Sequence, residues 1–175
     1  MIKKLRREVL QRARGNVLEL AVGTGKNLQY YSDVHRVTGV DLSPAMLKIA
    51  RKRAKGLHLP VNFLLMDAEN LAFCHQSFNT VVSSLSLCTF IDPVAALREI
   101  ARVCQTDGHI ILLEHGRSNW NWIGRWQDYT AERYAKKIGC HWNREPLNLI
   151  HQARLTLISV QRKFLGIFYT IEAKP

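Results

Sequence analysis

The sequence predicts an α/β protein with a doubly wound, mostly parallel sheet of seven strands. Over residues 16–114, short apolar runs alternate with helix-like segments, which is typical of parallel strands joined by crossover helices. Near the C-terminus, two further apolar runs follow each other with no helix-like segment between them. This second pattern indicates an antiparallel hairpin at the end of the chain.

Each predicted strand is a short run of residues that favour extended structure, bounded by turn residues. Several of these runs end in an acidic residue, as at Asp41 and Asp67. The predicted strands are residues 16–21, 36–40, 61–66, 79–85, 109–114, 155–161 and 167–173.

Helices are predicted where apolar residues recur at helical spacing or where a capping residue precedes a proline. Ser43-Pro44 and Asp92-Pro93 both show the second pattern. Proline suits the first helical position because the N–H that it lacks would have no helical partner there. The predicted helices are residues 2–13, 44–55, 93–104 and a tryptophan-rich stretch at 120–138.

Length and composition indicate one globular domain over residues 1–175. Hydrophobic residues make up 47% of the chain and charged residues 22%, which excludes the disordered, collagen and coiled-coil classes. No apolar run approaches the roughly 20 residues that a membrane-spanning helix needs. The N-terminus lacks the apolar core of a secretory signal. We therefore expect a cytoplasmic protein.

The charge balance is strongly basic, with 25 Lys and Arg against 14 Asp and Glu, a net charge of +11. Basic residues concentrate in residues 1–14 and 48–55. These clusters form either solvated helix faces or a surface that lies peripherally against anionic lipid headgroups. Nucleic acid is the weaker interpretation, because the sequence has no RNA-recognition, KH or zinc-finger pattern.

The four cysteines stand at positions 74, 88, 104 and 140 and form no CxxC motif. We interpret them as reduced thiols. Cys74-His75 and Cys140-His141 are adjacent pairs without a second, suitably spaced pair. The sequence therefore predicts no metal site.

The carboxyl ends of the predicted strands carry a set of residues that suits a nucleoside. The first strand ends in a glycine turn, and Asp41 follows Gly23 by 18 residues, where a carboxylate can accept both hydroxyls of a ribose. Asp67-Ala68 offers a carboxylate beside a backbone N–H, which matches the edge of an adenine. Position 28 is Leu rather than a third glycine, so no phosphate site is predicted.

These segments resemble a known family, the small class I S-adenosylmethionine-dependent methyltransferases of the UbiE/COQ5 type, which have a Rossmann-like sheet. The resemblance rests on GNVLELAVGTGKNLQYY (15–31), VTGVDLSPAMLKIARKRA (37–54), and the segments 62–93 and 97–118. Within the family, the chain is most similar to the branch of bacterial phosphatidylethanolamine N-methyltransferases and animal membrane thiol methyltransferases, in the segments GTGKNLQYY (23–31), LEHGRS (113–118) and GCHWNRE (139–145).

The resemblance implies S-adenosyl-L-methionine as the cofactor, S-adenosyl-L-homocysteine as its product, and a set of binding residues. Those residues are Glu19, Ala21, Gly23, Thr24 and Gly25 along the methionine part, Asp41 on the ribose, Leu42 and Met46 against the adenine, Asp67 and Ala68 on the adenine edge, Ser84 and Leu85 beneath the sulfonium, and Tyr30 closing over the cofactor. Ala21 stands where the family usually has glycine, so the backbone there must accommodate a Cβ atom.

The function implied by the resemblance is methyl transfer to a small or lipid-like acceptor, an amine, a thiol or a quinol. Family members usually carry a longer segment before the first strand, which forms a lid over the substrate, whereas only 14 residues precede Gly15 here. The alternative is therefore a cofactor-binding protein with little or no activity. A pocket edge exposed by a missing lid would also favour a homodimer.

A thiol or phenol acceptor must lose a proton, so a general base would assist the reaction. His115 follows the fifth predicted strand at the carboxyl edge and is the candidate catalytic residue. His141 lies in a polar insertion that could reach the mouth of the site, and Cys88 is interpreted as apolar lining. Trp120, Trp122 and Trp126 could cover the core, line an acceptor pocket or rest at a bilayer interface.

Overall fold

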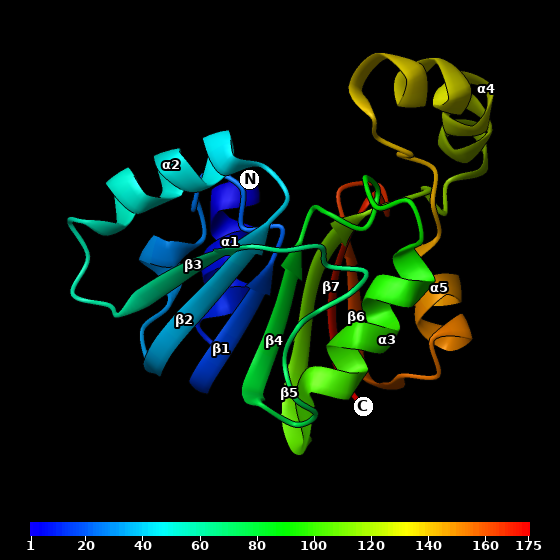
Figure 1. The fold of residues 1–175 in the computed structure, drawn as a ribbon. Helices are drawn as coiled ribbons and strands as arrows, with labels where there is room; N and C mark the ends of the chain where they lie inside the picture. The colour runs from blue at the N-terminus through cyan, green and yellow to red at the C-terminus, as the bar shows by residue number, and fades with distance from the viewer.

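A seven-stranded sheet in the order β3-β2-β1-β4-β5-β7-β6 runs through the computed structural model, which describes residues 1–175 (Figure 1). The strands are β1 (Gly15–Leu20), β2 (Val34–Asp41), β3 (Val61–Leu65), β4 (Phe78–Ser84), β5 (Cys104–His115), β6 (Thr156–Lys163) and β7 (Phe168–Lys174). Strands β1 to β5 pair in parallel, and β7 pairs antiparallel with both β5 and β6. The predicted fold class is confirmed.

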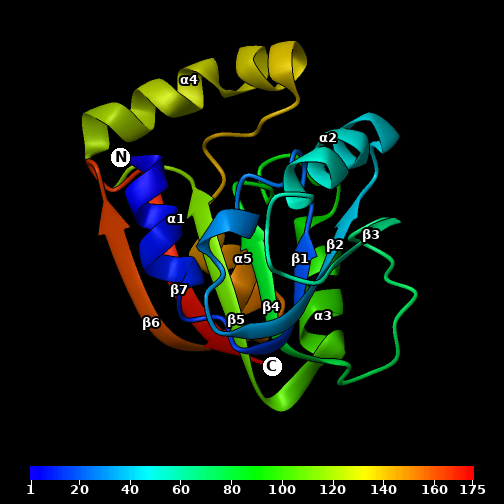
Figure 2. The ribbon, with the colours of Figure 1, turned by 90° about the vertical axis from the view of Figure 1, so that its left-hand side faces the viewer.

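Helices cover both faces of this sheet. They are α1 (Ile2–Leu10), the short 3-10 helix η1 (Leu28–Tyr30), α2 (Pro44–Ala54), α3 (Pro93–Val103), α4 (Asn121–Ile138) and α5 (Pro146–Gln152). On one face, Val9 and Leu10 of α1 pack against Val17 and its neighbours in the sheet. On the other face, α3 and α5 pack against strand residues such as Leu18 and Val81, which alternate along the strands with the residues that face α1. Figure 2 shows α1 in front of the sheet, on the face opposite α3 and α5.

The two predicted cap-then-proline helices begin where the sequence places them. Ser43 Oγ accepts a hydrogen bond from the Met46 amide at 3.3 Å. Asp92 Oδ1 accepts from the amides of Val94 and Ala95 at 3.0 and 2.9 Å. Each cap provides a partner for N–H groups that the first turn of a helix leaves free.

The structure differs most from the sequence prediction at β5 and α5, while α1 ends earlier than predicted, at Leu10, and η1 was not predicted. The turn expected at Asp107-Gly108 lies within β5, which begins at Cys104, and the pairing with β4 shifts register there. A Cβ atom at Gly108 would lie 2.9 Å from the Asn79 carbonyl oxygen, so glycine permits this irregular pairing. Helix α5 was not predicted, although Pro146 stands at its first turn.

Helix α4 lies apart from the two helical layers, beyond the carboxyl ends of the strands (Figures 1 and 2). Only Ile123, Gly124 and Gln127 of its residues are buried. Most of its surface therefore faces solvent. No helix in the structure combines the length and the apolar character needed to span a bilayer.

Candidate functional site

The strand order reverses direction between β1 and β4, and the candidate site lies at the carboxyl ends of these central strands. From β1 the chain proceeds outward to β2 and β3, and then returns to β4 and β5 on the other side of β1. Crevices form at such a switch point because the loops on its two sides lead away from each other.

The turn after β1 has a left-handed backbone at three alternate positions, Ala21 (φ 46°), Gly23 (φ 54°) and Gly25 (φ 72°). Asp41 at the end of β2 holds this turn, because its Oδ2 accepts a hydrogen bond from the Gly23 amide at 2.8 Å. Its Oδ1 accepts from the Ser43 amide at 2.8 Å. One carboxylate thus fixes both the glycine turn and the entry to α2.

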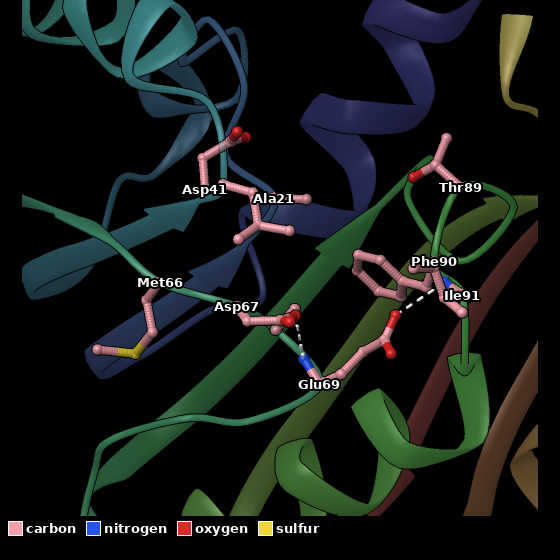
Figure 3. A pocket seen from close by; sticks show the side chains of 10 residues that line it. Ala21, Asp41, Met66, Asp67, Glu69, Thr89, Phe90 and Ile91 are labelled. Atoms are coloured by element: carbon pink, nitrogen blue, oxygen red, sulfur yellow. Dashed lines mark hydrogen bonds between the residues drawn. The ribbon is translucent and has the colours of Figure 1, made fainter.

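A first cavity of about 340 Å³ opens beside Asp41 (Figure 3). Five of the predicted residues line it, namely Ala21, Asp41, Leu42, Asp67 and Ala68, together with Met66, Glu69, Thr89, Phe90 and Ile91. Glu69 was not predicted, yet it bridges two loops of the wall. Its amide donates to Asp67 Oδ1 at 2.9 Å, and its Oε1 accepts from the Ile91 amide at 2.7 Å.

A second cavity of about 270 Å³ lies on the other side of Ala21, which lines both. It brings together the predicted residues Glu19, Gly23, Thr24, Met46, Ser84 and Leu85 with Arg6, Val22, Lys26 and Asn27. Met46 was predicted to lie against an adenine beside Leu42, but it lines the opposite cavity. The two cavities suit the two parts of an elongated ligand that crosses the switch point.

Gly25 and Tyr30 line neither cavity. A Cβ atom at Gly25 would lie 2.8 Å from Leu28 Cδ1 and 3.3 Å from the Ala50 Cα, so this glycine permits the turn to pack against α2. Tyr30 is partly buried against the core beneath α1. The neighbouring Tyr31 points inward instead, and nothing in the local sequence distinguishes the two tyrosines.

Glu19 is 2% exposed and accepts hydrogen bonds from two side chains that the sequence analysis missed. Asn27 Nδ2 donates to its Oε1 and the Tyr31 hydroxyl to its Oε2, each at 2.8 Å. Arg6 of α1 in turn donates to Asn27 Oδ1 at 2.8 Å. Burial raises the pKa of Glu19 to about 7, against the opposing effect of these hydrogen bonds.

A second buried carboxylate, Glu114, lies near the end of β5 and was also missed. It accepts from the Ser83 hydroxyl at 2.7 Å and from the amides of Ser86 and Leu87 at 3.0 and 3.3 Å. Burial raises its pKa to about 7 as well. Its hydrogen bonds hold the loop after β4, which carries Leu85 into the second cavity and Thr89 and Phe90 into the first.

The residues of the two cavities fit S-adenosylmethionine. The Ser84 hydroxyl oxygen is buried and has no hydrogen-bond partner, although Ser84 lines the second cavity. The space beside Gly23 is open, since the nearest atom to a Cβ there would be 3.8 Å away. The hydrogen-bond acceptors are also suitable for the hydroxyl and amino groups of this cofactor, because the Asp41 and Asp67 carboxylates line one cavity and Glu19 lines the other.

None of the three candidate bases, His115, His141 and Cys88, lines either cavity. Burial lowers the pKa of the His115 imidazole. Its Nε2 atom is 3.4 Å from Cys140 Sγ. Cys88 is buried, as expected for an apolar lining residue, while His141 is exposed and its amide donates to the Cys88 carbonyl at 2.9 Å.

Residues 18–112, more than half of the chain, match the family described as "Methyltransferase domain". The chain belongs to this methyltransferase family. The matched region runs from β1 to β5 and contains nearly all the residues of both cavities, and S-adenosylmethionine is the cofactor of the family.

Curated relatives extend the similarity. A mitochondrial methyltransferase of Saccharomyces cerevisiae, OMS1, is 32% identical over 98% of this chain and 40% of its own length. The phosphatidylethanolamine N-methyltransferase of Cereibacter sphaeroides is 40% identical over 58% of this chain and 51% of its own length. The human thiol S-methyltransferase TMT1B is 31% identical over 84% and 62%, respectively. The chain thus spans about 40 to 62% of the length of these relatives.

Solved structures confirm the fold. A methyltransferase structure from Bacillus halodurans aligns with a TM-score of 0.75 over 98% of this chain and 94% of its own. The two sequences are 17% identical, so this likeness concerns the fold alone.

Proposed function

We propose that this chain catalyses methyl transfer from S-adenosylmethionine to a small or lipid-like acceptor that carries an amine, thiol or quinol group. The observation that supports this function best is the pair of adjoining cavities at the switch point. Asp41 and Asp67 line one cavity, Glu19 and Ser84 line the other, and Ala21 lies between them.

In this proposal, the first cavity holds the adenosine and the second holds the methionine. The Asp41 carboxylate binds the ribose hydroxyls, Leu42 packs on the adenine, and Asp67 with the Ala68 amide binds the adenine edge. On the other side of Ala21, Glu19 attracts the α-ammonium group. Arg6, which lines the same cavity, supplies a positive charge for the α-carboxylate.

The bound cofactor supplies an electrophilic methyl group on a sulfonium. The chain then has two tasks, to orient the acceptor in line with the methyl group and to exclude water. Ser84 and Leu85 would form the surface beneath the sulfonium. His115 is assigned no proton transfer, because it lines neither cavity. A neutral amine requires no base to attack the methyl group, and a thiol or a quinol can first release its proton to solvent and react as the anion.

Calorimetric titration with S-adenosylhomocysteine tests the cofactor site. We expect saturable binding, no binding of NAD, and at least about tenfold weaker binding in Asp41→Ala, since about 1.4 kcal/mol corresponds to a factor of ten. Asp33→Ala is the matched control, because Asp33 is an exposed aspartate whose only ion pair is with Arg14. Absence of binding at millimolar ligand would contradict the proposal.

Turnover distinguishes an enzyme from the alternative, a cofactor-binding protein with little or no activity. The assay measures transfer of a labelled methyl group to phosphatidylethanolamine vesicles, to a small thiol and to a quinol. Transfer to one of them, lost in Asp41→Ala and retained in Asp33→Ala, supports the enzyme. Cofactor binding without transfer to any of the three supports the alternative.

We also propose that the outer face of α4 contacts an anionic membrane surface. This outer face consists of Trp122, Arg125, Tyr129, Arg133 and Lys136, which recur at helical spacing opposite the buried Ile123, Gly124 and Gln127. Trp122 is 68% exposed and Tyr129 is 89% exposed. Aromatic and basic residues on one helix face are typical of interfacial helices. Since α4 lies beyond the strand ends that carry the cavities (Figure 2), such contact would bring lipid to the site.

Flotation with vesicles tests this contact. We expect binding to vesicles rich in anionic lipid at low salt, little binding to neutral vesicles, and about tenfold weaker binding in the Trp122→Ala/Tyr129→Ala variant. Leu65→Ala is the control, because Leu65 is an exposed apolar residue on β3. Failure to float with anionic vesicles at low salt would remove this part of the proposal.

A further inference from the structure

Three potential metal ligands from separate segments converge beside the cavities, and the proposed methyl transfer uses none of them. Cys88 lies on the loop after β4, His115 is the last residue of β5, and Cys140 follows α4. Their ligand atoms, two sulfurs and an imidazole nitrogen, all lie within 4.8 Å of one another. The sequence analysis predicted no metal site, because Cys140 has only His141 beside it along the chain.

The distances suit a tetrahedral zinc ion. Ligand atoms about 2.0–2.3 Å from zinc lie about 3.3–3.8 Å apart when the angles are tetrahedral. Cys140 Sγ and His115 Nε2 are already 3.4 Å apart. The widest separation in the group is at most 4.8 Å, so side-chain shifts of about 1 Å complete the geometry.

Charge also favours a divalent cation here. Cys88 is 3% exposed, and Cys140 and His115 are half-buried. Two thiolates this close together and removed from water repel each other, whereas Zn²⁺ with two thiolates and a neutral imidazole has no net charge. Sulfur and imidazole ligands select zinc over magnesium or calcium, which prefer oxygen.

The ligands are held by the backbone around them. The His141 amide donates to the Cys88 carbonyl at 2.9 Å, and the Arg117 amide donates to the Arg144 carbonyl at 3.0 Å. Arg144 Nη1 donates to the Phe90 carbonyl at 2.8 Å and also to that of Leu87. These bonds fix the segment after α4 against the loop after β4.

We propose that Cys88 Sγ, Cys140 Sγ and His115 Nε2 bind one Zn²⁺ ion. No fourth His, Cys, Asp or Glu belongs to the group. The fourth coordination position is therefore open to water or to an incoming ligand, which is the arrangement of catalytic zinc sites rather than of closed structural ones. This inference does not depend on the proposed methyl transfer.

Metal titration of the full chain under thiol-reducing conditions tests the site. We expect one equivalent of Zn²⁺ per chain after removal of loosely bound metal, measured by elemental analysis. With Co²⁺ as the probe, we expect a thiolate-to-cobalt charge-transfer band and the visible bands of a tetrahedral ion. Cys88→Ser and Cys140→Ser should each weaken binding at least about tenfold, and His115→Ala should remove the nitrogen ligand with a similar loss.

Cys74→Ser is the matched control, because Cys74 is an exposed cysteine outside the group, and we expect it to retain one equivalent of zinc. Circular dichroism of each variant separates loss of a ligand from loss of the fold. Binding of no zinc by the reduced wild-type chain would overturn the proposal. So would full binding by a folded Cys88→Ser/Cys140→Ser variant.

Discussion

Glu19 shows at the scale of one residue how burial and hydrogen bonding oppose each other. Its carboxylate lies at the end of a central strand, where desolvation disfavours the charged form. Hydrogen bonds from Asn27 and Tyr31 compensate only in part, so the pKa is about 7 rather than near 4.5. The sequence located this glutamate at the strand end, but its protonation depends on Tyr31 and Asn27, which only the fold brings to it.

The raised pKa of Glu19 predicts that the fold is less stable at alkaline pH. The folded state holds a proton that the unfolded state releases above about pH 4.5, so this contribution is complete below pH 4.5 and is lost as pH rises through about 7. A shift from 4.5 to about 7 corresponds to about 3 kcal/mol. We expect Glu19→Gln to lose this part of the pH dependence, because glutamine keeps the shape and does not ionise.

Urea unfolding of both proteins between pH 5 and 9 provides the measurement. The difference between wild type and Glu19→Gln isolates this group, since Glu114 is present in both chains. Parallel stability curves for the two proteins across this range would show that Glu19 does not titrate in the folded state.

Ala21 stands where the family usually has glycine, and its backbone angle shows how the turn accommodates a Cβ atom. Its φ of 46° is left-handed, a conformation that costs an L-residue with a Cβ atom about 1–2 kcal/mol relative to glycine. The Asp41 carboxylate holds the turn two residues further on by accepting from the Gly23 amide. This hydrogen bond thus helps to hold the strained backbone conformation of Ala21, the residue that lines both cavities.

At the scale of elements, α3 fixes the irregular segment between β3 and β4. Arg102 of α3 donates to the carbonyls of Leu71 and Phe73, each at 2.7 Å. Glu99, one turn earlier, pairs with Arg102 at 2.7 Å and accepts from the Leu71 amide at 2.7 Å. The Arg102 hydrogen bond lowers the pKa of Glu99 accordingly. This segment contains Asp67 and Ala68, so α3 indirectly positions a wall of the first cavity.

We expect Arg102→Ala to lower the free energy of unfolding by about 2–4 kcal/mol, because it leaves two carbonyls and one carboxylate without their charged donor. Arg98→Ala is the control on the same helix. Arg98 is exposed and makes no side-chain hydrogen bond or ion pair in the structure, so its removal should change stability by less than about 0.5 kcal/mol. Urea denaturation measures both, and an equal effect of the two substitutions would refute the role given to Arg102.

The sequence predicted elements best where a local signal marks their ends. The proline-led starts of α2 and α3 agree with the structure, because the Ser43 and Asp92 caps act within a few residues. Prediction was poorer at β5, where the turn expected at Asp107-Gly108 is part of the strand. The pairing of β5 with β4 begins at Cys104, before the register shift, and continues after it. The residues of β4 that extend the strand in this way are distant in the sequence, so no local pattern around Asp107-Gly108 indicates them.

At the scale of the whole molecule, strand order decides which distant residues meet at the candidate site. Because β4 returns to the other side of β1, residues far apart in the chain, such as Ala21 and Phe90, line one cavity. The segment after α4 also returns to the ends of β4 and β5, which brings Cys140 to His115. Helix α4 itself remains outside both helical layers, beyond the same edge (Figure 1), and most of its residues are exposed.

The sequence by itself determined the α/β class and the order of the elements other than η1 and α5. These depend on hydrophobic periodicity, on caps and on turn residues, all of which are local in the chain. The resemblance to a known family, rather than periodicity, implied most of the predicted residues that line the two cavities. Only the tertiary structure decided that Tyr31 rather than Tyr30 contacts Glu19, that Met46 and Leu42 line different cavities, and that Cys88, His115 and Cys140 meet. Contacts between distant segments follow from strand order and packing, and no spacing along the sequence encodes them.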